Sequence, residues 1–149
     1  MKAISLHQPW ASLIAAGVKK VETRHWPVSH RGPLAVHAAK KLVSNCGEEV
    51  DELCLDEFGC EWRRTLPRGA IVATANLVAC ERMIEPSYPT AAGYPSHNEL
   101  ICGNWQQDRF AWLLEGVQAL KLPVPWCGMQ GLFNVELEPD DFRPAGARR

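Results

Sequence analysis

The sequence of 149 residues predicts an α+β domain that is mostly β. We expect a mixed, mostly antiparallel barrel of roughly five to six short strands with short helices at its ends. Several segments alternate apolar and polar residues with the period of two that is typical of strands, whereas only two segments have helical spacing. Strands and helices do not alternate as in parallel βαβ folds. The length predicts one domain over residues 1–140, followed by a frayed tail over residues 141–149.

The N-terminal segment predicts a strand, a short helix and a second strand. Residues 2–7 alternate in the pattern of a strand. Residues 10–16 follow Pro9 and predict a two-turn helix, because proline is tolerated in the first turn, and Gly17 can end it in the left-handed conformation. Residues 18–26 then predict a strand.

The rest of the chain predicts one more helix and several strands. Residues 44–61 have apolar residues at helical spacing with acidic residues on the opposite face. Residues 67–83 carry the strongest strand pattern. The segment 85–108 is rich in proline and glycine and is too long for a plain turn, as functional loops often are. Further strands are expected in the segments 34–40, 109–115, 119–125 and 131–138.

Charge is divided unevenly along the chain. The net charge is −1, but residues 1–41 carry seven Lys or Arg against the single acid Glu22, and the remainder is correspondingly acidic. Four of the five histidines also lie in residues 1–41. A basic segment beside an acidic remainder indicates an anionic partner, most commonly nucleic acid, although these lysines could equally be a solvated surface.

Six cysteines stand at positions 46, 54, 60, 80, 102 and 127, and no pair has the C-x-x-C spacing of a zinc or redox site. We expect reduced, partly buried thiols and no metal site. No apolar run approaches the roughly 20 residues of a membrane span, and the N-terminus lacks the apolar core of a secretory signal. The expected location is therefore cytoplasmic, without a membrane partner.

The segment between Gly17 and Trp26 holds the clearest candidate site. Lys20, Glu22 and Arg24 share one face of the predicted strand, as does Trp26, so the carboxylate would be held ionised between two cations and would fix their geometry. Lys19 falls at the preceding turn and can point into a cleft. The alternative is a structural ion pair on the surface of the barrel.

These residues also carry a resemblance to a known family. Gln8-Pro9-Trp10, the spacing Gly17-x-Lys19-x-x-Glu22-x-Arg24, and His37-Ala38 at the end of a strand resemble the opening of ASCH domains. The segments 67–80 and 123–137 resemble the family's central strand and its glycine-rich turn into a last strand. The segment 81–108 has no counterpart that we can place.

The resemblance implies a PUA-like β-barrel with a cleft lined by the Lys-Glu-Arg segment, which binds RNA or nucleotide-like ligands. A bacterial branch hydrolyses N4-acylated cytidine, and ribonuclease activity is proposed for other members. The lysine of that branch matches Lys19, but its partner threonine is replaced here by Glu22.

Two hypotheses follow for the same cleft. The first is a binding module for single-stranded RNA or a small nucleoside or nucleotide, without cofactor. Its ligand-binding residues would be Gln8, Pro9, Trp10, Lys19, Glu22, Arg24, Trp26 and His37. The second is a metal-independent hydrolase, an amidohydrolase or a ribonuclease, in which Lys19 acts as base or nucleophile activator and Glu22 transfers a proton. The binding hypothesis is favoured because no third catalytic partner is evident. The oligomeric state is left open.

Overall fold

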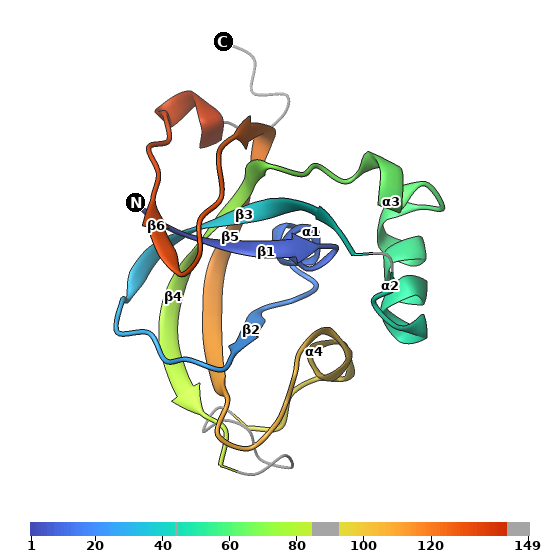
Figure 1. Ribbon diagram of the computed structural model, residues 1–149, viewed down its shortest axis with the longest axis vertical. Helices are drawn as coiled ribbons and strands as arrows, with labels where there is room; N and C mark the ends of the chain where they lie inside the picture. Colours follow the sequence, from blue (N-terminus) through green and yellow to red (C-terminus); the bar gives the residue numbers. More distant parts are fainter. Residues whose placement is uncertain (44, 85–92, 143–149) are drawn as a thin grey trace.

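The computed structural model describes residues 1–43, 45–84 and 93–142. Six strands, four α-helices and one 3-10 helix occur in these residues (Figure 1). In chain order they are β1 (Lys2–Gln8), α1 (Trp10–Ala15), β2 (Val21–Arg24), β3 (Gly32–Leu42), α2 (Glu48–Phe58), α3 (Trp62–Thr65), β4 (Ala70–Arg82), α4 (His97–Cys102), β5 (Phe110–Pro125), β6 (Leu132–Asn134) and η1 (Pro139–Phe142).

The strands form one mixed sheet in the order β2-β5-β4-β3-β1-β6. β1 and β3 pair in parallel, and every other neighbouring pair is antiparallel. Figure 1 shows β1 and β3 running across β4 and β5, so the sheet is strongly curled. The mixed, mostly antiparallel α+β prediction is confirmed. The closed barrel is not, because β2 and β6 stand at opposite ends of the order that the described strands form.

The first predicted elements are present with small changes of extent. α1 begins after Pro9, and the backbone reverses at Gly17, whose φ of +77° lies in the left-handed region that favours glycine. β2 is shorter than predicted, at four residues. It pairs with β5 and places Glu22 opposite Trp112.

α1 lies between the sheet and a second layer of helices. Its Ile14 packs into the main core with Leu34, Val36 and Trp112. Its neighbour Leu13 instead joins a helical cluster with residues of α2, α3 and α4. The other face of the sheet carries a smaller core of Ala3, Ala35, Ile71, Leu120, Phe133 and Val135.

Two predictions for the C-terminal half were wrong. The segments 109–115 and 119–125 are one strand, β5, which continues through a bulge at Gly116, where φ is +59° and the pairing with β4 shifts. The segment 85–108 contains α4, although residues 85–92 lie outside the described residues. The expected frayed tail begins inside η1, and its residues 143–149 also lie outside them.

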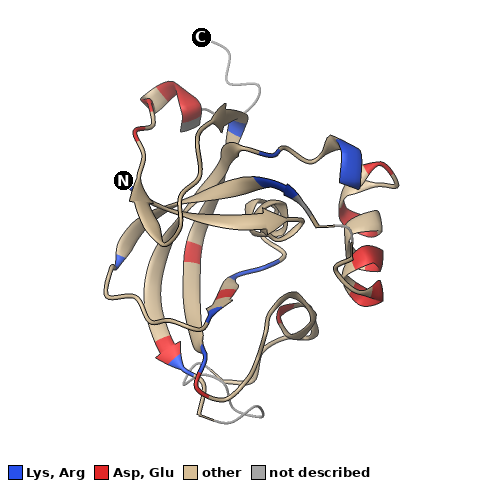
Figure 2. Cartoon of the chain, in the orientation of Figure 1, with Lys and Arg blue, Asp and Glu red and all other residues tan. Residues whose placement is uncertain are grey.

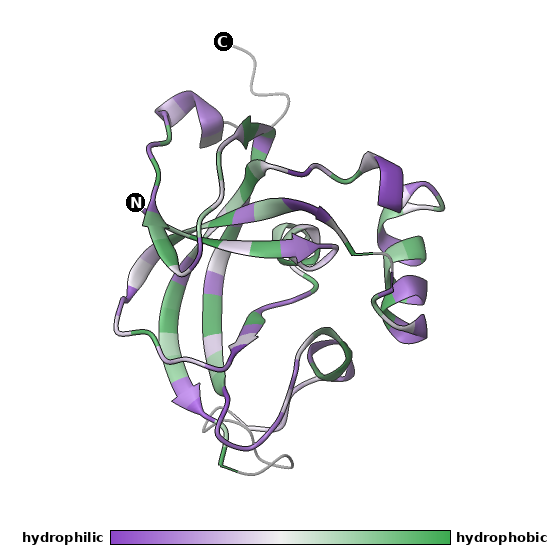
Figure 3. Cartoon of the chain, in the orientation of Figure 1, coloured by the Kyte–Doolittle hydropathy of each residue, from purple (hydrophilic) through white to green (hydrophobic). Residues whose placement is uncertain are grey.

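The helix predicted over residues 44–61 is α2, which ends at Phe58 and is followed by the short α3. Figure 3 shows hydrophobic and hydrophilic residues alternating along α2, and Val50 and Cys54 are the buried ones. Within the described ranges, no helix is long and apolar enough to cross a membrane.

Candidate functional site

Two adjoining cavities open beside β1 and β2. The larger, which we call cavity 1, has a volume of about 800 Å³, and the smaller, cavity 2, about 450 Å³. Four residues line both: Ser5, His7, Arg24 and His25. Ser5 and His7 belong to β1, Arg24 ends β2 and His25 follows it, so the two strands form the ridge along which the cavities meet.

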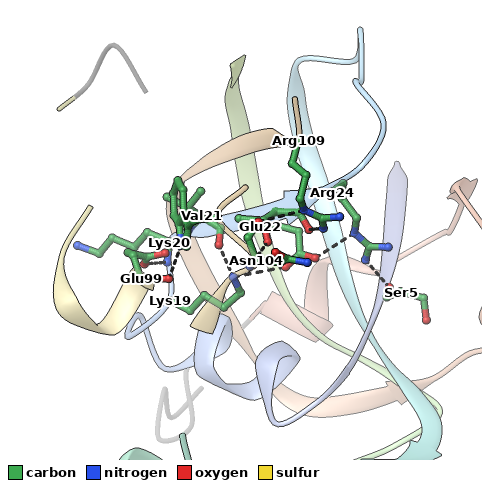
Figure 4. A network of polar contacts seen from close by, with 11 residues as sticks. Ser5, Lys19, Lys20, Val21, Glu22, Arg24, Glu99, Asn104 and Arg109 are labelled. Atoms are coloured by element: carbon green, nitrogen blue, oxygen red, sulfur yellow. Dashed lines mark hydrogen bonds and ion pairs between the residues drawn. The ribbon is translucent and has the colours of Figure 1, made fainter. Parts of the chain in front are cut away.

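Arg24 is fixed on this ridge by two hydrogen bonds (Figure 4). Its Nε donates to Glu22 Oε1 at 2.9 Å, and its Nη2 donates to the backbone oxygen of Ser5 at 2.8 Å. Glu22 and Arg24 stand two residues apart on β2, so they share a face, as the sequence predicts. The guanidinium is half-buried and its orientation is set from two strands.

Lys19 contacts Glu22 of this pair from the interior of the protein. Its side chain is 1% exposed, its Nζ donates to the backbone oxygen of Val21, and the same nitrogen lies 3.5 Å from Glu22 Oε2. Glu22 thus bridges a buried ammonium and a half-buried guanidinium, one with each carboxylate oxygen. Such an arrangement restrains both oxygens of the carboxylate.

α4 and the loop after it cover the outer edge of β2. Glu99, which is 7% exposed, accepts the N–H groups of Lys20 at 2.5 Å and Val21 at 3.1 Å. Asn104 donates its N–H to Thr23 Oγ1 at 2.8 Å. The bond to Val21 occupies an N–H that an edge strand would otherwise leave unpaired, and β2 pairs with β5 along its other side, so it is held on both sides.

Arg109 ties the same loop to β2 and lines cavity 2. Its Nη2 donates to the backbone oxygen of Thr23 at 3.3 Å, and its Nε donates to that of Asn104 at 3.0 Å. Cavity 2 also contains Cys102. Burial raises the pKa of the Cys102 thiol, while Lys19 acts in the opposite direction. The thiol is therefore protonated at neutral pH.

His37 lies in the wall of cavity 1 and is 1% exposed. Its Nδ1 is 2.7 Å from Ser5 Oγ, and its Nε2 is 2.9 Å from the backbone oxygen of Trp126. A Cβ atom at Gly128 would stand 2.5 Å from the His37 ring, so only glycine fits over it. β1 and β3 place Ser5 directly beside His37 in the parallel register.

Of the eight ligand-binding residues proposed from sequence, the structure brings five to the cavities. Trp10 and Glu22 line cavity 2, Trp26 and His37 line cavity 1, and Arg24 lines both. The other three, Gln8, Pro9 and Lys19, line neither. The buried Gln8 side chain instead bonds to Ser12 and to the backbone oxygen of Pro67, which fixes the start of α1.

Only some of the basic residues of the N-terminal segment line cavity 1. Arg24 and Lys40 line it together with three histidines, and no Asp or Glu is found in its described lining. Lys2 and Arg31 line neither cavity. Figure 2 shows acidic residues gathered on α2 and η1. The basic residues that line cavity 1 and the acidic residues of α2 and η1 therefore lie in different parts of the molecule.

The sequence alone did not identify four residues that line the cavities or hold β2 in place: Ser5, Glu99, Asn104 and Arg109. A signal for Glu99 exists in the sequence: Ser96 and Glu99 have the S-x-x-E spacing of a capping box, and Ser96 Oγ accepts the N–H of Glu99 at 3.3 Å. No group of three or more His, Cys, Asp or Glu that could hold a metal occurs in the parts of the chain described.

Comparison with known proteins identifies the family. The model of the ASCH domain matches residues 4–123, so this chain belongs to the ASCH domain family. It is 34% identical over 112 residues to activating signal cointegrator 1 of Mus musculus, an alignment that covers 70% of this chain and 19% of the relative. The human protein of the same name is 34% identical over 93 residues, 58% of this chain and 16% of the relative. The alignment thus spans less than a fifth of either relative.

Solved structures support the fold. The crystal structure of ASCH from Zymomonas mobilis aligns with a TM-score of 0.55 at 15% identity, covering 91% of this chain and 87% of that one. A variant of the same protein aligns with a TM-score of 0.54 at 16% identity, covering 94% and 91%. These matches support the α+β fold of this chain.

Proposed function

We propose that this chain binds single-stranded RNA, or a nucleotide-like ligand, across the two joined cavities. The observation that carries the proposal is the position of Arg24 on the ridge between them. Its guanidinium is oriented by Glu22 and by the backbone of Ser5, and its third nitrogen, Nη1, has no acceptor among the described residues. A pre-oriented guanidinium between two hollows fits a phosphate that joins two nucleosides.

The two cavities offer different surfaces to such a ligand. Trp26 lines cavity 1 and is held edge-on against Trp112, with ring centroids 4.7 Å apart. Trp10 lines cavity 2 and is partly buried against the core. Bases stack on fixed aromatic rings without strict sequence preference. Arg24 would contact the phosphate, Glu22 would orient Arg24, and Lys19 would hold Glu22 in place.

The hydrolase hypothesis built on Lys19 has less support. Lys19 lines neither cavity, and its ammonium group is bonded to Val21 and paired with Glu22. A base or nucleophile must reach the reacting atom within hydrogen-bond distance. We therefore assign Lys19 a positioning role.

Salt dependence of binding tests the proposal. Affinity for a short fluorescent single-stranded RNA should fall steeply between about 50 and 200 mM salt, because each phosphate contact releases counterions. A mononucleotide should compete with the RNA. A flat salt response, or no binding at low salt, would contradict the proposal. Duplex DNA of the same length serves as the comparison ligand, and tighter binding to it would argue against a single-stranded site.

A further inference from the structure

A hydroxyl and an imidazole stand hydrogen-bonded in the wall of cavity 1, and the binding function needs neither. Ser5 Oγ lies 2.7 Å from His37 Nδ1. The opposite ring nitrogen, Nε2, lies 2.9 Å from the backbone oxygen of Trp126. A carbonyl oxygen can only accept, so Nε2 carries the hydrogen, and in the neutral ring Nδ1 accepts the hydrogen of the Ser5 hydroxyl.

This order of contacts is that of an activated nucleophile. A serine becomes nucleophilic when a base takes its proton, and the base works when a third group fixes its tautomer and orientation. Here the backbone of Trp126 fixes His37. The ring is also held edge-on against Phe133, with centroids 5.8 Å apart, and is covered by Gly128. His37 cannot turn away from Ser5 without losing these contacts.

The loop above the pair can stabilise a developing negative charge. Gly128, Met129 and Gln130 line cavity 1, and their backbone N–H groups have no acceptor within the described ranges. A Cβ at Gly128 would stand 3.1 Å from Ser5 Oγ, so the loop backbone lies next to the nucleophile. Backbone donors beside the attacked carbonyl are the usual means of binding a tetrahedral oxyanion.

Arg24 indicates the charge of the substrate. Its Nη2 bonds to the backbone oxygen of Ser5, so the guanidinium stands beside the nucleophile. Lys40, His7 and His25 line the same cavity, and its described lining contains no carboxylate. An ester that carries an anionic group would be drawn to this position, with its carbonyl toward Ser5.

We propose that Ser5 and His37 form a nucleophile–base pair that hydrolyses carboxylic esters bearing an anionic group. Ser5 Oγ bonds to the carbonyl carbon as its proton passes to His37 Nδ1. The carbon–oxygen bond to the alcohol then breaks, and His37 returns the proton to the departing oxygen. A water molecule then bonds to the acyl carbon as its proton passes to His37 Nδ1. The bond from that carbon to Ser5 Oγ breaks, His37 returns the proton to Ser5 Oγ, and the acid is released. The proposal does not depend on RNA binding.

The test uses the mono-4-nitrophenyl ester of succinic acid, with the neutral 4-nitrophenyl propionate as comparison. We expect a burst of one nitrophenolate per chain, an adduct on the Ser5 peptide by mass spectrometry, and faster acylation by the anionic ester. Ser5→Ala should abolish the burst, and His37→Ala should slow it by about 10²-fold or more, the usual contribution of a positioned base. Ser29→Ala, at an exposed serine outside both cavities, should match the wild type.

Several outcomes would overturn the proposal. One is an adduct on the exposed Cys127, which lines the same cavity, with none on Ser5. Others are the absence of any adduct, or an unchanged burst in Ser5→Ala. Ser5→Ala removes only one partly exposed oxygen, so we expect this variant to fold. It therefore tests the nucleophile even if His37→Ala does not fold. The wild-type chain separates the two proposals, because RNA binding is measured by anisotropy without ester and acylation by the burst without RNA, so either one can fail while the other stands.

Discussion

Two carboxylate–guanidinium pairs in this chain show how differently the same interaction can be used. Glu22 and Arg24 lie on one strand at 2.9 Å, and their side chains are 13% and 24% exposed. Asp51 and Arg63 lie on two helices at 2.5 Å, and theirs are 36% and 40% exposed. Each carboxylate has a further partner: Lys19 for Glu22, and the Cys46 thiol for Asp51.

The difference lies in what surrounds each pair. Arg24 is also bonded to the backbone of β1, and the strand that carries it is bonded to α4, so the guanidinium is fixed beside two cavities. The other pair lines neither cavity. Arg63 instead lies over the Trp62 ring, 4.2 Å from its centroid. The first pair is therefore suited to present a charge to a ligand, and the second to join α2 to α3.

The largest expected effect is the loss of ligand binding in Arg24→Ala. Removing a charge-assisted phosphate contact should weaken RNA binding by about tenfold or more, since such hydrogen bonds contribute roughly 1.5–3 kcal/mol. Arg63→Ala is the matched control and should bind like the wild type. Fluorescence anisotropy at one fixed salt concentration measures both variants. Equal affinities in the two variants would remove Arg24 from the site.

The next largest effect is expected in Glu22→Gln, which tests whether Glu22 acts on the ligand through Arg24. The amide keeps the shape but not the charge that holds the guanidinium. Binding should fall about as far as in Arg24→Ala, and the double variant should add little, because the two residues act as one unit. Additive losses would show that Glu22 contacts the ligand independently of Arg24.

The next effect concerns stability. Glu99→Gln replaces an oxygen that accepts a backbone N–H by an amide nitrogen that cannot, in a residue only 7% exposed. The free energy of unfolding should fall by about 1–3 kcal/mol, the cost of a buried unsatisfied donor. The control is Glu61→Gln, which breaks the pair with Arg64 where both side chains are at least 60% exposed. Urea unfolding should detect little change there. A Glu99→Gln variant as stable as the wild type would contradict the covering role of α4.

Local periodicity explains which parts of the site could be predicted from sequence. The pairing of Glu22 with Arg24 followed from the period of two along one strand. The same period along β3 puts Leu34 and Val36 in the main core and Ala35 in the smaller core on the other face. Such relations need no knowledge of the fold, because neighbours along a strand are fixed by backbone geometry.

Contacts between distant segments could not be predicted in this way. Ser5 and His37 are 32 residues apart and meet only because β1 and β3 pair in parallel with a particular register. Glu99 lies 79 residues from Lys20, in a segment interpreted as a loop. The burial of Lys19 likewise depends on how α1, β2 and α4 pack, which the pattern at the turn does not reveal.

A smaller effect is expected in the alkylation rates of two exposed thiols. Cys127 lines cavity 1, whereas Cys60 lies before α3 and lines neither cavity. Both should react with iodoacetamide in the folded protein, and Cys54, whose pKa burial raises to about 12, should react far more slowly. Saturating RNA should protect Cys127 and leave Cys60 unchanged. Peptide mass spectrometry measures each rate, and equal rates at Cys127 with and without RNA would place the ligand outside cavity 1.

The smallest expected effect is the pH dependence of the Asp51 interaction. A hydrogen bond from the Cys46 thiol, with a further contribution from Arg63, lowers the pKa of Asp51 below its ordinary value of 3.8. Burial, followed by Asp51 itself, raises the pKa of Cys46 to about 11, so the thiol remains a donor throughout the neutral range.

A carboxyl whose pKa is lower in the folded state stabilises the protein above its unfolded pKa, and this contribution disappears as the pH falls through the folded pKa. Wild type should therefore exceed Asp51→Asn in stability by a constant amount from about pH 5 upward, well below 1 kcal/mol for so exposed a pair. The difference should shrink below about pH 4. Urea unfolding of both variants at several pH values measures it. A difference that grows on acidification would have the wrong sign for a lowered pKa, and would mean that the Asp51 carboxylate is not stabilised by Cys46 and Arg63.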